Sequence, residues 1–141
     1  MIKPLLVAAL ALTAAPALSG TATGPEARRC LADVVYAEAR GESRTGQIAV
    51  AEVVMNRVAK RGFPGTVCGV ARQSGQFSRP VPVREPGAYA RAQEIAEVVI
   101  AGEAAPVTNG ALYFHTTAVR PDWSGRFRRT ARIGDHVFYG R

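Results

Sequence analysis

The sequence predicts an α+β fold, with a core of about four helices followed by a small antiparallel sheet. Two observations carry this prediction. Apolar residues recur at three-to-four-residue spacing from about residue 25 to residue 101, which is typical of helices that bury one face. After Pro106 the chain turns to short segments rich in β-branched and aromatic residues, which is typical of strands. Helices and strands that follow one another in separate blocks favour an α+β domain.

The first 22 residues are interpreted as a secretory signal peptide, which leaves residues 23–141 as one domain. Lys3 precedes an apolar run from Leu5 to Leu18, and the small residues Ala17 and Ser19 provide a cleavage site. A membrane anchor is the alternative, but the run is shorter than the roughly 20 residues that span a bilayer. We therefore expect export to the periplasm, the cell wall or the extracellular space, with no membrane span in the mature chain.

The predicted elements have recognisable start and stop signals. Helices are expected over residues 24–39, 46–60, 67–72 and 87–101, with Thr23, Thr45 and Thr66 as N-caps of the first three. The second helix is apolar on much of its circumference, with a stripe of Ile48, Ala51, Met55 and Val58 flanked by Val50 and Val54, so it is expected to be central. Residues 73–86 are rich in Gly, Pro, Ser and Arg and are expected to form an irregular loop. Strands are expected over 111–115, 128–133 and 136–139, the last two joined by a Gly134-Asp135 hairpin.

One glutamate, Glu38, continues the apolar stripe of the first helix. The stripe consists of Ala27, Leu31, Val34 and Val35. Position 38 follows at helical spacing, near the C-terminus of the helix. Burial and the negative end of the helix dipole both favour the protonated form of a carboxyl group, which is what a general acid requires. The alternative is a glutamate that is paired with Arg40 or Arg57.

Several short blocks then stand in one order along the chain. They are residues 36–42 (YAEARGE), 46–51 (GQIAVA), 54–58 (VMNRV), 63–70 (FPGTVCGV), 76–78 (QFS), 111–114 (ALYF) and 133–139 (IGDHVFY). In these blocks the chain resembles the cell wall hydrolase family, whose best-known members are the spore cortex-lytic enzymes. The resemblance covers essentially the whole mature chain. It implies a fold similar to the core of lysozymes and lytic transglycosylases, and it maps the proposed catalytic glutamate of the family onto Glu38.

The resemblance implies cleavage of peptidoglycan glycan strands at the linkage between N-acetylmuramic acid and N-acetylglucosamine. Glycosidases ordinarily need a second carboxylate, whereas lytic transglycosylases use one. The candidates for a second one are Glu42, Glu52 and Asp122, and Gly41 is expected to break the helix between Glu38 and Glu42. Without a clear partner, transglycosylation is favoured over muramidase-type hydrolysis. An N-acetylmuramoyl-L-alanine amidase and a non-catalytic wall-binding module are the further alternatives.

Candidate substrate-binding residues follow from the same resemblance and from strand alternation. They are Gln76, Tyr113, Glu42, Ser78, Trp123 and His115. Gln76 is expected to line the cleft, and Tyr113 and His115 are expected to point away from the core if Leu112 and Phe114 face it. Trp123 suits either a sugar-stacking platform or a core anchor, and a lone histidine is more often structural. Phe77 is expected to pack into the core, and Asn56 and Arg57 are expected to brace the structure.

The net charge and the cysteine content indicate what kind of polymer the chain binds and whether it contains a disulfide. The net charge of +7 includes only Lys3 from the first 22 residues, so the mature chain remains basic. An exported basic protein is more suited to the carboxylates of peptidoglycan than to nucleic acid. The even number of cysteines, Cys30 and Cys68, favours a disulfide, with two free thiols as the alternative. His115 and His136 make a poor zinc site, so no metal or other cofactor is expected, and we expect a monomer.

Overall fold

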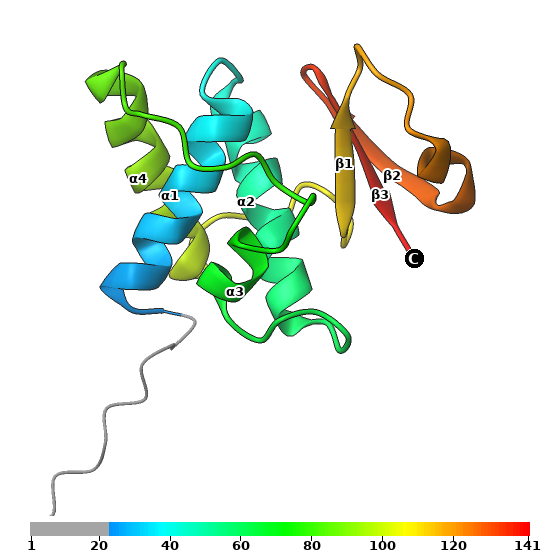
Figure 1. Cartoon of the computed structure of the whole chain (residues 1–141), viewed down its shortest axis with the longest axis horizontal. Coiled ribbons are helices and arrows are strands. Elements are labelled where there is room, and N and C mark those ends of the chain that lie inside the picture. Colours follow the sequence, from blue (N-terminus) through cyan, green and yellow to red (C-terminus); the bar gives the residue numbers. More distant parts are fainter. Residues whose placement is uncertain (1–22) are drawn as a thin grey trace, which may run out of the picture.

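The computed structural model describes residues 23–141, so the expected signal peptide lies outside the described residues. The helices are α1 (Pro25–Ala39), α2 (Arg44–Ala59), α3 (Val67–Ala71) and α4 (Pro86–Ile100). They are followed by the strands β1 (Tyr113–Thr116), β2 (Arg128–Ile133) and β3 (His136–Gly140), with a short 3₁₀ helix η1 (Asp122–Arg126) between β1 and β2. Figure 1 shows the helices gathered on one side and the sheet on the other. The predicted α+β fold is confirmed. Within residues 23–141, no helix is long and apolar enough to cross a membrane.

The helical lobe is built around α1 and α2. On α1 the predicted stripe is buried, with Leu31 and Val35 fully enclosed. On α2 the expected central position is confirmed, but the stripe is only partly right: Ala51 is enclosed, as are Ala49, Val50, Val53 and Val54, whereas Ile48, Met55 and Val58 are only half-buried. Because α1, α3, α4 and the sheet all pack against α2, its burial extends around the helix instead of following one seam.

The helix caps confirm one sequence prediction and correct two. Thr66 caps α3, since its hydroxyl oxygen accepts from Gly69 N at 3.0 Å. Thr23 is not the cap of α1, which starts from Gly24 without a side-chain hydrogen bond because Pro25 already supplies the first helical φ angle. Thr45 is not the cap of α2 either. Ser43 occupies that position and accepts from Gly46 N at 3.2 Å, so the helix starts two residues earlier than predicted.

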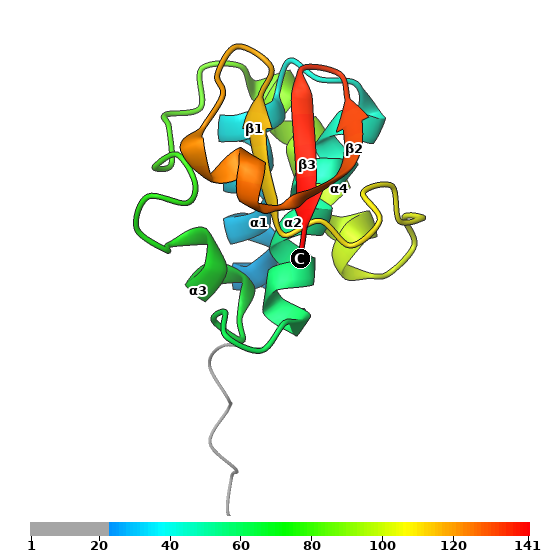
Figure 2. The ribbon, with the colours of Figure 1, turned by 90° about the vertical axis from the view of Figure 1, so that its right-hand side faces the viewer.

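The sheet has the order β1-β3-β2 and is antiparallel throughout. One face carries Phe114 and Phe138, which pack onto the helical core. The other face carries Tyr113 and His115, as the alternation predicted. Figure 2 views the sheet from this outer face, where the segment between β1 and β2 lies in front of its lower half.

The β2–β3 hairpin is fastened to the turn between α1 and α2. The predicted Gly134-Asp135 turn is present, and Gly134 has a φ of 55°, which favours glycine. A side chain at Gly134 would also collide with the carboxylate of Glu42. That carboxylate accepts from Asp135 N at 3.3 Å and lies 3.7 Å from His136 Nδ1. The hairpin is therefore seated on Glu42.

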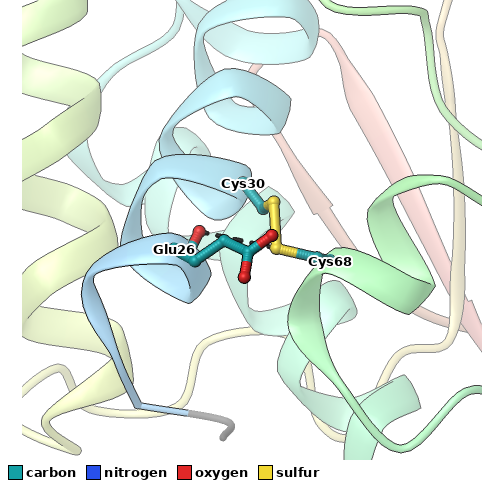
Figure 3. A group of neighbouring side chains, drawn as sticks. All are labelled: Glu26, Cys30 and Cys68. Atoms are coloured by element: carbon teal, nitrogen blue, oxygen red, sulfur yellow. Dashed lines mark hydrogen bonds between the residues drawn. A yellow bond between two sulfur atoms is a disulfide. The ribbon is translucent and has the colours of Figure 1, made fainter. Parts of the chain in front are cut away.

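A disulfide between Cys30 and Cys68 joins α1 to α3, with 5.3 Å between the two Cα atoms. It confirms the pairing that the cysteine count favoured (Figure 3). Glu26 lies beside it, and the three residues bring possible ligand atoms within 4.8 Å of one another. A disulfide sulfur is not a thiolate, however, and the thiolate is the form that binds metals. This cluster is therefore a structural cross-link and not a metal centre.

Candidate active site

Glu38 lies in the last turn of α1, half-buried, and faces the loop between α3 and α4. Its Oε1 atom accepts a hydrogen bond from the backbone N–H of Ser78 at 2.5 Å. Neither arginine that sequence offered as a partner pairs with it. Arg40 binds Glu85 at 3.2 Å, and Arg57 donates elsewhere. Among residues 23–141 no ion pair involves Glu38.

The loop that contacts Glu38 is irregular, as predicted, but it is tied down at three points. Gln73 and Gln76 both accept hydrogen bonds from Arg57, at 3.5 and 3.1 Å. Ser78 is held by Glu38 itself. At the far end, the backbone N–H groups of residues 84 and 85 donate to the hydroxyl of Tyr36 at 3.1 and 3.2 Å. Tyr36 stands in the same block as Glu38, yet its role in anchoring the loop was not predicted.

Arg57 is the centre of the contact between the helical lobe, the loop and the sheet. It is only 3% exposed, and its Nε donates to Leu112 O at 2.7 Å, immediately before β1. Its guanidinium also lies about 5 Å from three aromatic rings, those of Phe63, Phe77 and Tyr113. Burial lowers the pKa of Arg57, and the neighbouring Tyr113 offsets part of that effect. With Asn56, which donates to Ala111 O at 2.9 Å, it confirms the predicted bracing role.

A cavity of 450 Å³ opens between this loop and the sheet. It brings together four of the six candidate binding residues, namely Gln76, Tyr113, His115 and Trp123. The Trp123 ring is half-buried and packs near Tyr113 and Tyr139 at 5.8 and 5.5 Å between ring centres. Trp123 is thus both part of an aromatic cluster and part of the cavity wall. Phe77 packs into the core instead, against Phe114 at 6.1 Å, as predicted.

His115 is fixed by two hydrogen bonds. Its Nδ1 lies 2.7 Å from the carbonyl of Thr116, and its Nε2 lies 2.9 Å from the hydroxyl of Tyr139. Because a carbonyl only accepts, this network places the proton on Nδ1, and Nε2 accepts from Tyr139. Both nitrogens are engaged, so His115 contributes a ring surface to the cavity and not a free base.

A larger cavity of 870 Å³ lies on the opposite side of the loop, between α1 and residues 71–80. Ser78 and Asp33 both line it. Asp33 accepts from the hydroxyl of Tyr89 at 2.8 Å, and burial together with this bond raises the pKa of Tyr89. Asp33 was not predicted, since one acid on the flank of a helix carries no signal in the sequence.

The other acidic candidates serve different contacts. Glu42 holds the hairpin, and its side chain is only 14% exposed. Glu52 accepts from the backbone N–H groups of residues 107 and 108, at 2.7 and 3.2 Å, and so secures the connection that leads into β1. Asp122 is exposed at the start of η1. A substrate-binding role of Glu42 and a role of Ser78 beyond its bond to Glu38 stay predictions.

Most of the chain matches a known protein family. Residues 41–139 match the family model described as Cell Wall Hydrolase. The chain belongs to the cell wall hydrolase family. The sequence resemblance is therefore confirmed, and the match begins three residues after Glu38.

Relatives and solved structures support the same placement. Spore cortex-lytic enzymes of Bacillus cereus and Bacillus subtilis are each 32% identical, over 77% and 78% of this chain and 42% and 36% of theirs. The chain thus spans less than half the length of these curated relatives. The crystal structure of the catalytic domain of the Bacillus cereus SleB protein has a TM-score of 0.70 and 28% identity, covering 84% of this chain and 92% of that one. The catalytic domain of the germination-specific lytic transglycosylase SleB from Bacillus anthracis has a TM-score of 0.67, also at 28% identity, covering 83% and 96%.

Proposed function

We propose that this chain is a lytic transglycosylase, which cleaves peptidoglycan glycan strands between N-acetylmuramic acid and N-acetylglucosamine with Glu38 as its catalytic carboxyl group. The observation that carries the proposal is the setting of Glu38: a half-buried acid free of ion pairs, held by one backbone N–H of the loop that also supplies Gln76 to the aromatic cavity. Membership of the family and the likeness to the catalytic domain of a lytic transglycosylase support it.

The chemistry needs one carboxyl group that works twice. Ser78 N–H occupies Oε1, so we assign the proton to Oε2. Glu38 gives this proton to the N-acetylglucosamine oxygen as the bond from C1 of N-acetylmuramic acid breaks, and an oxocarbenium-like centre develops. The resulting carboxylate then takes the proton from the 6-hydroxyl of the same muramic acid, whose oxygen attacks C1. The product is a 1,6-anhydro sugar, no water is consumed, and Glu38 ends protonated as it began.

The surroundings of the remaining acids favour this one-carboxyl scheme over hydrolysis. A retaining glycosidase places its second carboxyl about 5–5.5 Å from the first, and an inverting one about 6.5–9.5 Å away. Glu42 and Glu52 are instead committed to backbone N–H groups that hold the hairpin and the chain before β1. Their carboxylates thus have structural partners already, and the third candidate, Asp122, is exposed at the start of η1.

The aromatic cavity supplies the binding surface for sugars in this proposal. Tyr113 and Trp123 offer ring faces for the apolar faces of pyranose rings, and Gln76 offers an amide for an acetamido group. Arg57 fixes the Gln76 side chain through its oxygen, which leaves the amide N–H₂ to donate. The protein would then act as a monomer on peptidoglycan in the periplasm, the cell wall or the extracellular space.

Mass spectrometry of the fragments released from purified peptidoglycan tests the proposal. We expect fragments that end in 1,6-anhydro-muramic acid, each lighter by one water than the corresponding reducing fragment. Reducing ends alone would assign a muramidase-type hydrolase, and free stem peptides with intact glycan would assign an amidase. Binding to peptidoglycan without any released fragment would assign a wall-binding module.

A further inference from the structure

A groove of 380 Å³ lies on the outer face of the sheet, under the segment that connects β1 to η1. Arg120, Arg129 and Arg132 line it, together with the aromatic side chains of His115 and Tyr139. We propose that this groove binds carboxylates of the peptide stems of peptidoglycan, so that the substrate is peptide-bearing glycan. The inference rests on the proposed function, because it names the form of the substrate that function would use.

A β-bulge creates this groove. Residues three apart on a regular strand point to opposite faces, so Arg129 and Arg132 would be separated by the sheet. The pairing of β2 with β3 shifts between Arg129 and Ala131, leaving Thr130 as the extra residue. As a result Arg129 stands opposite Tyr139 and Arg132 stands opposite Val137, and both line the same groove. The bulge thus turns two arginines toward one ligand.

The charges in the groove have no internal partner. No acidic residue lines it. Within residues 23–141 the ion pairs of arginine involve only Arg28, Arg40, Arg44 and Arg72, all of them in the helical lobe. Arginine presents a planar fork of donors that matches a carboxylate, so three unpaired arginines around one groove favour a ligand with several carboxylates.

The position of the groove favours stem peptides over other anions of the wall. His115 lines both this groove and the aromatic cavity proposed for sugars, so the two sites share a wall. A ligand that occupies both must be bonded to the sugar and branch away from it. A stem peptide does so, since it is attached to the lactyl group of muramic acid and carries several carboxylates along its length. The lactyl carboxylate of stripped glycan lies beside the ring and offers a single charge.

Sedimentation with insoluble peptidoglycan tests the inference, using peptidoglycan freed of attached protein and phosphate-containing polymers. Binding is measured in a Glu38→Gln background so that the polymer is not consumed. The test variant is R129Q/R132Q, and the matched control is R126Q/R128Q, which removes the same charge from exposed positions of the same lobe outside the groove. Three polymers are compared: intact peptidoglycan, peptidoglycan with its carboxylates coupled to a neutral amine, and amidase-stripped glycan, which has lost its peptide cross-links and is therefore immobilised on beads for sedimentation.

We expect R129Q/R132Q to weaken binding to intact peptidoglycan about tenfold and R126Q/R128Q to weaken it about twofold or less, because only the first pair makes direct charged hydrogen bonds. On neutralised peptidoglycan and on stripped glycan the test variant should bind like its parent. Equal losses in both variants would overturn the inference in favour of non-specific attraction. If R129Q/R132Q loses as much binding on stripped glycan as on intact peptidoglycan, the groove is a sugar or lactyl site and the inference is overturned. If R129Q/R132Q binds intact peptidoglycan as tightly as its parent, the inference is overturned as well.

Failure of the proposed function can be distinguished from failure of this inference. The proposed function is measured by fragment release from intact peptidoglycan by the chain with Glu38 intact, whereas the groove is measured by binding in the Glu38→Gln background. If no fragments are released but the predicted loss of binding is seen, the inference about the groove stands and the assignment as an enzyme fails. If anhydro fragments are released but the predicted loss of binding is not seen, the assignment as an enzyme stands and the inference about the groove fails.

Discussion

The two lobes of this protein treat their arginines differently. In the helical lobe, four exposed arginines pair with glutamates on neighbouring elements, as Arg28 does with Glu97 and Arg44 with Glu94, while others such as Arg29 and Arg91 are in no ion pair within the described residues. Residues 113–141 hold six arginines, and none of them is in an ion pair within the described part of the chain. Exposed pairs add little stability, so their main effect is to balance charge locally. The sheet lobe keeps its charge available, which is the property expected of a surface that meets an anionic polymer.

The lobes also differ in what holds them. The helical lobe has a fully enclosed apolar core and the Cys30–Cys68 cross-link. The sheet has three short strands and depends on docking, through Phe138 on its inner face and through the hydrogen bond from Arg57 to the chain before β1. The joint between the lobes is therefore also the wall of the proposed site, and changes there should affect stability and activity together.

Replacing both cysteines by serine should have the largest effect on stability. The disulfide closes a loop with a sequence separation of 38, for which chain entropy gives about 4 kcal/mol. We expect C30S/C68S to lower the free energy of unfolding by roughly this amount in urea titrations. The unmodified protein titrated in the presence of a thiol reductant is the control and should match it. A loss below about 1 kcal/mol would show that the apolar core alone holds the helical lobe.

Arg57→Gln should have the next largest effect and should cut the joint between the lobes. The substitution leaves the Leu112 carbonyl buried without its donor and frees Gln73 and Gln76. We expect a loss of about 3 kcal/mol in unfolding free energy and a fall in fragment release at a temperature where the variant is still folded. The exposed neighbour Arg61, changed to Gln, should stay within about 0.5 kcal/mol of the parent. Equal effects of the Arg57 and Arg61 substitutions would contradict the role of Arg57 in joining the two lobes.

Ser43→Ala should have the smallest effect and should be confined to the helical lobe. Loss of the cap at the start of α2 is expected to cost about 1 kcal/mol in thermal or urea unfolding, with no change in binding to peptidoglycan. Thr45→Ala is the matched control, and its effect should be within about 0.5 kcal/mol, because Thr45 lies inside the helix and caps nothing. A larger loss of stability for Thr45→Ala than for Ser43→Ala would instead identify Thr45 as the cap, as the sequence alone suggested.

Sequence patterns predicted most of the fold because periodicity and turn chemistry are local. The α1 stripe, the Thr66 cap, the Gly134-Asp135 hairpin and the outward direction of Tyr113 all follow from spacing. The cap of α2 was misplaced because Ser43 and Thr45 are both capping residues two positions apart. Only the packing of the helix decides between them.

The site was only partly predictable, since its essential contacts are long-range. Ser78 donates to Glu38 across forty positions of sequence, through a loop that has no periodicity. Likewise the bulge at Thr130 leaves no mark in the sequence, where Arg129 and Arg132 read as residues on opposite faces. The six candidate binding residues came from resemblance and alternation. The cavity unites four of them because Arg57 draws the loop onto the sheet.

The rate of fragment release by Glu38→Gln tests the central claim most directly. Glutamine keeps the size of the side chain and an oxygen for Ser78 N–H, so the fold and the binding of peptidoglycan should persist. The proton to be donated is lost, and we predict a fall in rate on the order of 10³-fold with unchanged sedimentation on peptidoglycan. Glu42→Gln should retain far more activity than Glu38→Gln in any preparation that keeps its hairpin folded. A Glu38→Gln protein that releases anhydro fragments at the parent rate would contradict the account.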